Sequence, residues 1–236
     1  MADEVWIPQA AVEETLREYG YKGKVEVVDN GSDFAGNIPV EQLRRSARDK
    51  LRLPSDEFMF LFVGQHIWEK NLEFLLEALA EIRTLPFRMY FIGSGYAASE
   101  LRRKTEDLYL TDKVIFMGSI TERERLKLYY AAADLFLFPS LYDNAPLVVR
   151  EAAALHTPSL LIKGSTSAEV IHDSVNGFLS DNSVTAYASR ISQLLETPQL
   201  IAEAGEAASH SIARSWEDVA EEVYDRYVNL IHRSGN

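Results

Sequence analysis

The sequence predicts an α/β fold built on a doubly wound parallel sheet. Short runs of residues are apolar along their whole length, as in Phe58–Val63. Segments with apolar residues at helical spacing lie between these runs. Strands without alternating polar residues are typical of parallel sheets that helices cover on both faces. Together these observations indicate a Rossmann-like domain over residues 37–200.

The elements follow one another in regular alternation. Apolar residues recur at helical spacing after the first run, and a later helix is expected to begin at a capping box formed by Thr121 and Glu124. Another helix is expected to carry Pro146 in its first turn, where proline is tolerated. The predicted strands lie at residues 58–63, 88–92, 114–117, 135–138 and 159–162, and the predicted helices at about 72–79, 97–108, 121–132 and 146–155.

The two ends of the chain differ from this pattern. Residues 1–36 predict a strand, a helix and a strand with no sheet of their own, which we interpret as the last pieces of a preceding domain. Unpaired strand edges there would favour self-association. Residues 201–236 predict closing helices, and the helical spacing from Trp216 to Tyr227 favours a helix packed on the body.

Composition excludes several classes of protein. The 236 residues carry a net charge of -12, which argues against nucleic acid as a partner because phosphates require a basic surface. The absence of cysteine excludes disulfides and thiolate-bound metals, and the histidines show no ligand spacing, so we expect no metal. No apolar run is long enough to span a membrane, and Met1-Ala2-Asp3-Glu4 does not begin a signal peptide. We therefore expect a soluble, cytoplasmic protein.

The strongest candidate site lies in Pro139–Ala154, where a buried strand leads through a loop into a helix. Ligands of doubly wound sheets bind beyond the carboxyl ends of the strands. The free backbone N–H groups of Leu147 and Val148, with the helix dipole, suit a diphosphate. Asp143 and Glu151 suit the hydroxyl groups of a sugar and a ribose on either side. The alternative is that Asp143 caps the loop and Glu151 is a surface acid.

This segment resembles the E-x7-E motif of retaining nucleotide-sugar glycosyltransferases with the GT-B fold, whose pattern is P-S-x-x-E-x-F-G-x-x-x-x-E-A-x-A-x-G-x-P. Asp143 stands at the first acid and is one methylene shorter. Asn144-Ala145-Pro146 replaces the usual Gly-Phe-Gly, and His156 replaces a glycine. The matching residues are Pro139, Ser140, Glu151, Ala152, Ala154 and Pro158.

Further segments resemble the same family. Val63–Asn71 is similar to V-G-R-x-x-x-E-K-G, in which the Arg and the Lys hold the donor diphosphate; Lys70 is kept and Gln65 replaces the Arg. Phe91–Gly95 is similar to the I-G-x-G-P turn, and Val114–Gly118 to the strand whose end meets the nucleotide base. Val175–Leu179 is similar to a hairpin near the end of such domains.

The resemblance implies the second half of a GT-B fold, which is the donor-binding domain of a hexosyltransferase that acts with retention. It assigns the diphosphate to Lys70, the donor sugar to Asp143 and the ribose to Glu151, as the catalytic residues. It implies no cofactor and a UDP- or GDP-sugar as donor. The acceptor, and any membrane, would meet the missing N-terminal domain, so weak activity is expected from this chain alone. The implied donor-binding residues are Gly64, Gln65, Gly93, Met117, Asn144, Ala145, Leu147 and Val148.

Other functions remain as alternatives or are disfavoured. The departures at Gln65 and Pro146 favour a non-catalytic sugar-nucleotide-binding or scaffold domain as the second hypothesis, and an epimerase of the same fold is a third. A dinucleotide site is disfavoured because Ala98 stands where G-x-G-x-x-G requires its last glycine. Ser140 lacks a nucleophile-elbow pattern, which disfavours a hydrolase. His66 either touches the donor or is a polar loop residue.

Overall fold

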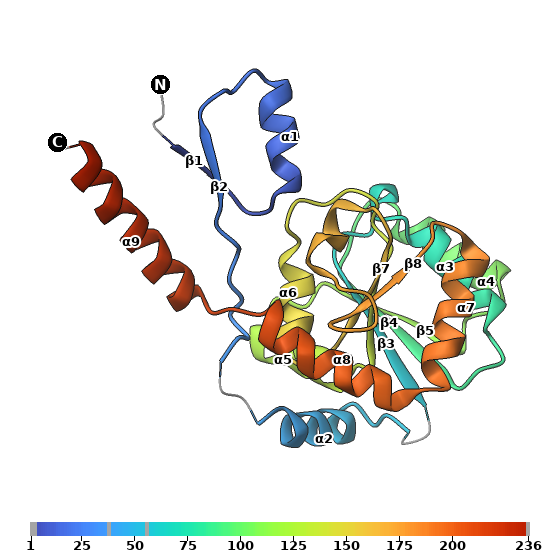
Figure 1. Ribbon diagram of the computed structural model, residues 1–236. Coiled ribbons are helices and arrows are strands. Elements are labelled where there is room, and N and C mark those ends of the chain that lie inside the picture. The colour runs from blue at the N-terminus through green and yellow to red at the C-terminus, as the bar shows by residue number, and fades with distance from the viewer. Residues whose placement is uncertain (1–3, 37–38, 55–56, 235–236) are drawn as a thin grey trace.

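The computed structural model describes residues 4–36, 39–54 and 57–234 (Figure 1). Met1, Ala2, Asp3 and the predicted domain boundary at position 37 lie outside the described residues. Within that part of the chain, six parallel strands form the main sheet. Their order across the sheet is β5 (Val114–Gly118), β4 (Phe87–Ile92), β3 (Phe58–Val63), β6 (Leu135–Phe138), β7 (Ser159–Ile162) and β8 (Phe178–Ser180). The direction of winding reverses between β3 and β6, which confirms the doubly wound α/β prediction.

The strands are buried on both faces, which explains their continuous apolar sequences. Phe60, Leu61 and Phe62 of β3 are all 0% exposed. Phe62 stacks on Phe138 of β6 with a ring separation of 5.9 Å, and Phe91 of β4 extends the same aromatic layer. Burying both faces of a strand removes the requirement for alternating polar residues.

Helices cover the sheet in two groups (Figure 1). In one group α3 (Leu72–Glu81) packs on α4 (Ala98–Asp107) and α7 (Val184–Leu195). In the other, α5 (Arg123–Ala132) packs on α6 (Leu147–Ala154) and on α2 (Val40–Lys50), a helix that the sequence analysis does not predict. Two short 3-10 helices, η1 (Trp68–Lys70) and η2 (Thr166–Val170), follow β3 and β7.

Three local predictions are wrong. The α5 helix starts at Arg123 after Glu122 as N-cap, and no side chain caps it, so Thr121 and Glu124 form no capping box. Pro146 is the N-cap of α6 with an extended ψ of 118°, so the helix begins one residue later. Residues 175–179 form no hairpin, because β8 pairs with β7 in parallel.

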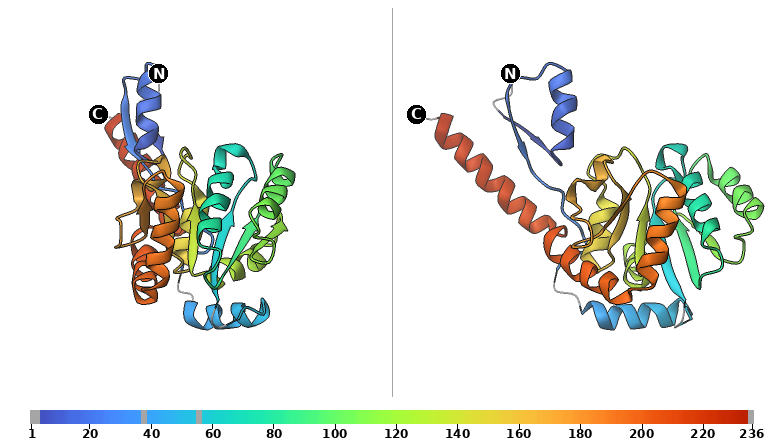
Figure 2. Two further views of the ribbon diagram at one scale, coloured as in Figure 1. Left: turned by 90° about the vertical axis from the view of Figure 1, so that its right-hand side faces the viewer. Right: turned by 45° about the vertical axis from the view of Figure 1, so that its right-hand side comes forward.

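The N-terminal unit, residues 4–27, has a small sheet of its own, contrary to expectation. Strands β1 (Glu4–Ile7) and β2 (Lys24–Val27) pair in parallel along all four residues, and α1 (Ala11–Glu18) connects them. The last helix, α9 (Trp216–Ser234), leaves the main sheet and runs beside this unit (Figure 2). The rings of Trp6 and Tyr227 lie 4.9 Å apart, edge to face. The predicted packing of this helix on the body is therefore wrong.

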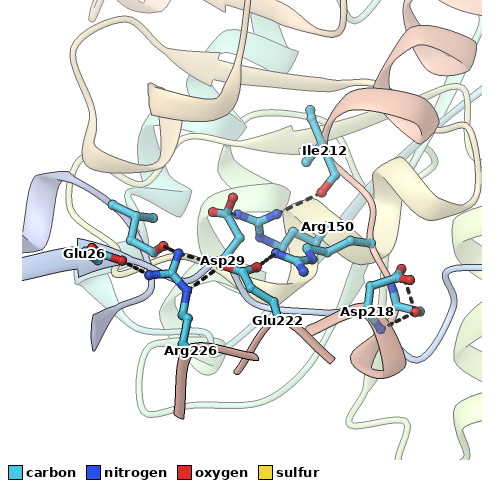
Figure 3. A network of polar contacts seen from close by, with 10 residues as sticks. Glu26, Asp29, Arg150, Ile212, Asp218, Glu222 and Arg226 are labelled. Atoms are coloured by element: carbon cyan, nitrogen blue, oxygen red, sulfur yellow. Dashed lines mark hydrogen bonds and ion pairs between the residues drawn. The ribbon is translucent and has the colours of Figure 1, made fainter. Parts of the chain in front are cut away.

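A buried arginine joins the segment that follows the N-terminal unit to the body (Figure 3). Arg150 of α6 is only 5% exposed; it pairs with Asp29 at 2.5 Å and donates to the carbonyl oxygen of Ile212 at 2.8 Å. Ile212 directly follows α8 (Pro198–Ser211), which contains the predicted boundary at residue 200. Arg226 of α9 pairs with Glu26 and donates to the carbonyl oxygen of Val27, which ties the end of β2 to α9.

Candidate functional site

An ion pair spans the point where the winding of the sheet reverses. Lys70 ends η1, after β3, and Asp143 lies in the loop after β6. The ammonium group of Lys70 contacts a carboxylate oxygen of Asp143, and their side chains are 17% and 19% exposed. The structure thus brings together two of the predicted site residues at the edge where ligands of such sheets bind.

The backbones of two loops approach closely beside this pair. Gly93 has φ +136°, and a Cβ atom placed on it would lie 1.9 Å from the carbonyl oxygen of Gly64. A Cβ atom on Gly95 would lie 2.3 Å from the carbonyl oxygen of His66. Only glycine allows this contact. The loop so held carries Gln65, which is exposed.

The loop that carries Asp143 is fixed on its other side by η2. The backbone N–H of Asp143 donates to the hydroxyl of Thr166 at 2.7 Å, and that hydroxyl donates to the carbonyl oxygen of Asp143 at 2.8 Å. Asn144 follows in an exposed position. The α6 helix then begins at Leu147, which is 43% exposed, with Val148 half-buried. The first N–H groups of a helix have no partner within it, so this end of α6 suits an anion.

Ala145 is held by the N-terminal unit and by the segment that follows it. Its N–H donates to the side-chain oxygen of Gln9 at 2.7 Å, and its carbonyl oxygen accepts from the amide of Asn30 at 3.3 Å. The residue is 6% exposed and has φ +43°. From the sequence we expect these backbone groups to be open to a nucleotide-sugar donor. In the structure, both are hydrogen-bonded within the protein. Gln9 is a residue of this site that the sequence analysis missed.

Glu151 is a buried acid with two protein partners. It is 7% exposed, which contradicts its reading as a surface acid. One carboxylate oxygen accepts from the guanidinium of Arg123 at 2.7 Å, and the other accepts from the hydroxyl of Tyr130 at 2.8 Å. Neither partner figures among the predicted site residues. Both come from α5, so they follow from the packing of α5 on α6.

The end of β5 meets the same edge. Met117 is half-buried there, and Gly118, with φ +70°, accepts a hydrogen bond from the N–H of Gly93 at 2.9 Å. The ends of β3, β4 and β5 are therefore joined by backbone contacts that involve Gly64, Gly93 and Gly118.

His66 turns into the core, which argues against the donor contact that was one of its two readings. It is 2% exposed, and its ring lies 6.3, 6.1 and 5.9 Å from the rings of Phe62, Phe91 and Phe116. Within the described part of the chain, its Nε2 atom has no hydrogen-bond partner. Burial, with a smaller effect of the positive charge of Arg102, lowers the pKa of His66 below its ordinary 6.5.

We expect the substitution His66→Leu to stabilise the protein and to flatten its pH dependence. Leucine removes an unpaired buried nitrogen, which is worth about 1 kcal/mol at pH 7. The unfolded chain binds the histidine proton more tightly than the native protein, so the free energy of unfolding falls as pH drops below 6.5. The slope from one group is at most about 1.4 kcal/mol per pH unit. Urea unfolding from pH 5 to 8 tests this; equal slopes for both proteins would contradict it.

No group of three or more histidine, aspartate or glutamate side chains is arranged to hold a metal ion in residues 4–36, 39–54 and 57–234. In the same part of the chain, no helix combines the length and the apolar character needed to cross a bilayer.

Comparisons with known proteins agree on one group of enzymes. A family model described as glycosyl transferases group 1 matches residues 44–211. D-inositol 3-phosphate glycosyltransferase 2 of Catenulispora acidiphila is 32% identical over 232 residues, which cover 92% of this chain and 54% of the relative. This chain spans about half the length of the curated relatives it matches.

Solved structures show the same architecture. Sucrose-phosphate synthase from Thermosynechococcus elongatus superposes with a TM-score of 0.84 at 26% identity, over 99% of this chain and 59% of the other. HepE of Anabaena, in complex with UDP and glucose, superposes with a TM-score of 0.81 at 20% identity, over 97% of this chain and 64% of the other. The second likeness is one of fold alone.

Proposed function

The chain belongs to the group 1 family of glycosyl transferases, and from this premise we propose that its strand-end site binds a nucleotide-diphosphate sugar for transfer of the sugar with retention. One observation carries the proposal. Two acids eight positions apart, Asp143 and Glu151, lie on either side of the start of α6, and the first is paired with Lys70. A cation beside the first acid, free helix N–H groups after it and a second acid further along α6 support a diphosphate with hydroxyl-bearing groups on either side.

Each residue then has a role that its surroundings support. Lys70 and the N–H groups of Leu147 and Val148 stabilise the negative charge that grows on the leaving diphosphate, an interaction that strengthens as the glycosyl bond breaks. Asp143 holds hydroxyl groups of the donor sugar. Glu151, buried about one helical turn after the start of α6, holds the ribose. HepE, whose structure contains UDP and glucose, has the same fold and supports a UDP-sugar, with a GDP-sugar as the other candidate.

Sugar transfer also requires a site for the acceptor. Relatives of this chain are about twice as long, and we propose that an N-terminal domain supplies the acceptor site and any membrane contact in a cytoplasmic enzyme. That domain would continue the N-terminal unit, whose Gln9, with Asn30 of the segment that follows it, contacts Ala145 in the loop before α6. Robust, specific sugar transfer by the 236-residue protein alone would contradict this division of labour.

A non-catalytic sugar-nucleotide-binding or scaffold domain is the second candidate. Gln65 stands at a position where the resembling family carries a phosphate-binding arginine, and it is exposed with no charge to offer. Pro146, the N-cap of α6, has no N–H to donate. A protein that lost two diphosphate contacts could retain the fold without turnover.

Calorimetry with UDP- and GDP-sugars tests the proposed function. We expect one of the two classes to bind the wild-type protein and the substitution Glu151→Ala to weaken that binding at least about tenfold, because hydrogen bonds to a charged acceptor contribute about 1.5–3 kcal/mol. Glu124→Ala, at an exposed acid on α5, is the matched control and should change nothing. Absence of binding to the wild type would favour the scaffold, and tight binding by Glu151→Ala would remove the ribose role.

A further inference from the structure

The Glu151 carboxylate is only partly used by its protein partners. Arg123 occupies one oxygen at 2.7 Å and Tyr130 the other at 2.8 Å. A carboxylate has about four lone-pair sites, so each oxygen can accept one more hydrogen bond. The carboxylate therefore has acceptor capacity for two neighbouring hydroxyl groups in addition to its two protein donors.

Tyr130 is fixed in place as a hydrogen-bond donor. Its ring is 0% exposed and packs 5.9 Å from the ring of Phe34 and 5.8 Å from that of Phe136. Burial, with the nearby charge of Glu151 as a further cause, raises the pKa of Tyr130 well above its ordinary range. The hydroxyl group keeps its proton, so it donates to Glu151 and prevents free rotation of the carboxylate.

Arg123 is anchored by the segment that follows the N-terminal unit. Its guanidinium contacts Asp33 at 3.1 Å and lies 4.3 Å from the centre of the Phe34 ring. The same group reaches Glu151, whose side chain is 9% exposed, whereas that of Arg123 is 42% exposed. The carboxylate is thus held from the buried side by Tyr130 and from the solvent side by Arg123.

We propose that Tyr130 and Arg123 are positioning residues that determine specificity: they orient the Glu151 carboxylate so that its free lone pairs accept both hydroxyls of a ribose diol. The inference rests on the proposed function, because it assigns the nucleotide to this site. A carboxylate fixed at both oxygens presents its two remaining acceptors in one arrangement, which matches two adjacent hydroxyl groups. A 2′-deoxyribonucleotide leaves one of these buried acceptors unpaired, and unpaired polar groups of this kind are the basis of strong discrimination.

Calorimetry with UDP, GDP and their 2′-deoxy counterparts tests the proposal. For the base that binds, the wild-type protein should prefer the ribonucleotide by about tenfold or more. Tyr130→Phe and Arg123→Met should each weaken ribonucleotide binding about fivefold and leave 2′-deoxyribonucleotide binding nearly unchanged. The ratio of the two affinities should therefore fall toward one. Arg123→Lys keeps one charged donor and should recover part of the preference. Arg125→Met, at an exposed arginine of the same helix, is the matched control.

The outcomes separate this inference from the proposed function. If no nucleoside diphosphate binds the wild type, both are overturned. If the wild type binds with no preference for the ribonucleotide, or if Tyr130→Phe and Arg123→Met keep the full preference, only the inference is overturned. A merely structural role for the two residues would weaken both ligands equally and leave the ratio unchanged, which also contradicts it. Circular dichroism and urea unfolding of each variant identify any loss of folding.

Discussion

Replacing Lys70 with alanine is expected to weaken the binding of the nucleoside diphosphate about a hundredfold, which corresponds to about 2.7 kcal/mol. The lysine is mostly buried and paired with Asp143 at the winding reversal. Its removal takes away a cation and leaves a carboxylate that repels the diphosphate. Truncating one member of a buried charge pair typically costs 2–5 kcal/mol or more. Calorimetry measures the change, and Lys50→Ala, at an exposed lysine on α2, serves as control.

A second substitution separates the two causes. If part of the loss comes from the uncompensated charge of Asp143, then Asp143→Asn in the Lys70→Ala protein should recover several-fold in affinity. The same substitution in the wild-type background should recover nothing. Unchanged affinity in Lys70→Ala would show that the diphosphate does not lie beside this pair, and the proposed roles of Leu147 and Val148 would lose their support with it.

The sequence predicts the main sheet well because its strands are buried on both faces. Five apolar runs correspond to β3 to β7, and the prediction for β3 agrees with the observed Phe58–Val63. The three-residue strand β8 was missed because so short a run carries no clear pattern. The α2 helix was missed because most of its residues are polar; Arg44 and Arg48 hold it in place through ion pairs with Asp134, 90 and 86 positions away.

The candidate site likewise contains residues that a local sequence motif indicates and residues that only contacts between distant positions bring there. Lys70, Asp143 and Glu151 stay predictions, and each could be proposed from the sequence because it stands in a local motif that follows a strand. Gln9 and Asn30 could not, because their contacts with Ala145 join positions 136 and 115 residues apart. His66 lies in a loop with a polar sequence, but nothing in that sequence shows that its side chain points inward.

Two departures from the family pattern are informative about the backbone. Asn71 and His156 stand where the resembling family has glycine, and both have left-handed φ values, 56° and 57°. Glycine adopts this region without steric cost, and asparagine is among the few other residues that tolerate it. Both glycines of the family pattern therefore correspond to left-handed backbone positions, which this chain fills with asparagine and histidine.

The substitution Gly93→Ala should destabilise the protein by about 3 kcal/mol or more, because interiors do not accommodate an atom inside van der Waals distance without a shift of backbone. Its Cβ atom would lie 1.9 Å from the carbonyl oxygen of Gly64, and its φ of +136° is unfavourable for alanine as well. Relief requires the loop after β3 to move, and that loop leads to Lys70. Loss of stability and loss of diphosphate affinity should therefore occur together.

Gly118→Ala distinguishes the clash from the backbone strain. Gly118 ends the neighbouring strand and has φ +70°, but a Cβ atom there would meet no atom within 4 Å. It should cost only the left-handed conformation of an alanine, about 1 kcal/mol. Urea midpoints for the two variants measure the difference. Equal losses of stability in the two variants would mean that backbone strain alone accounts for the effect of Gly93→Ala. The close approach of the two loops would then not be the contact that holds Lys70 at the strand-end edge.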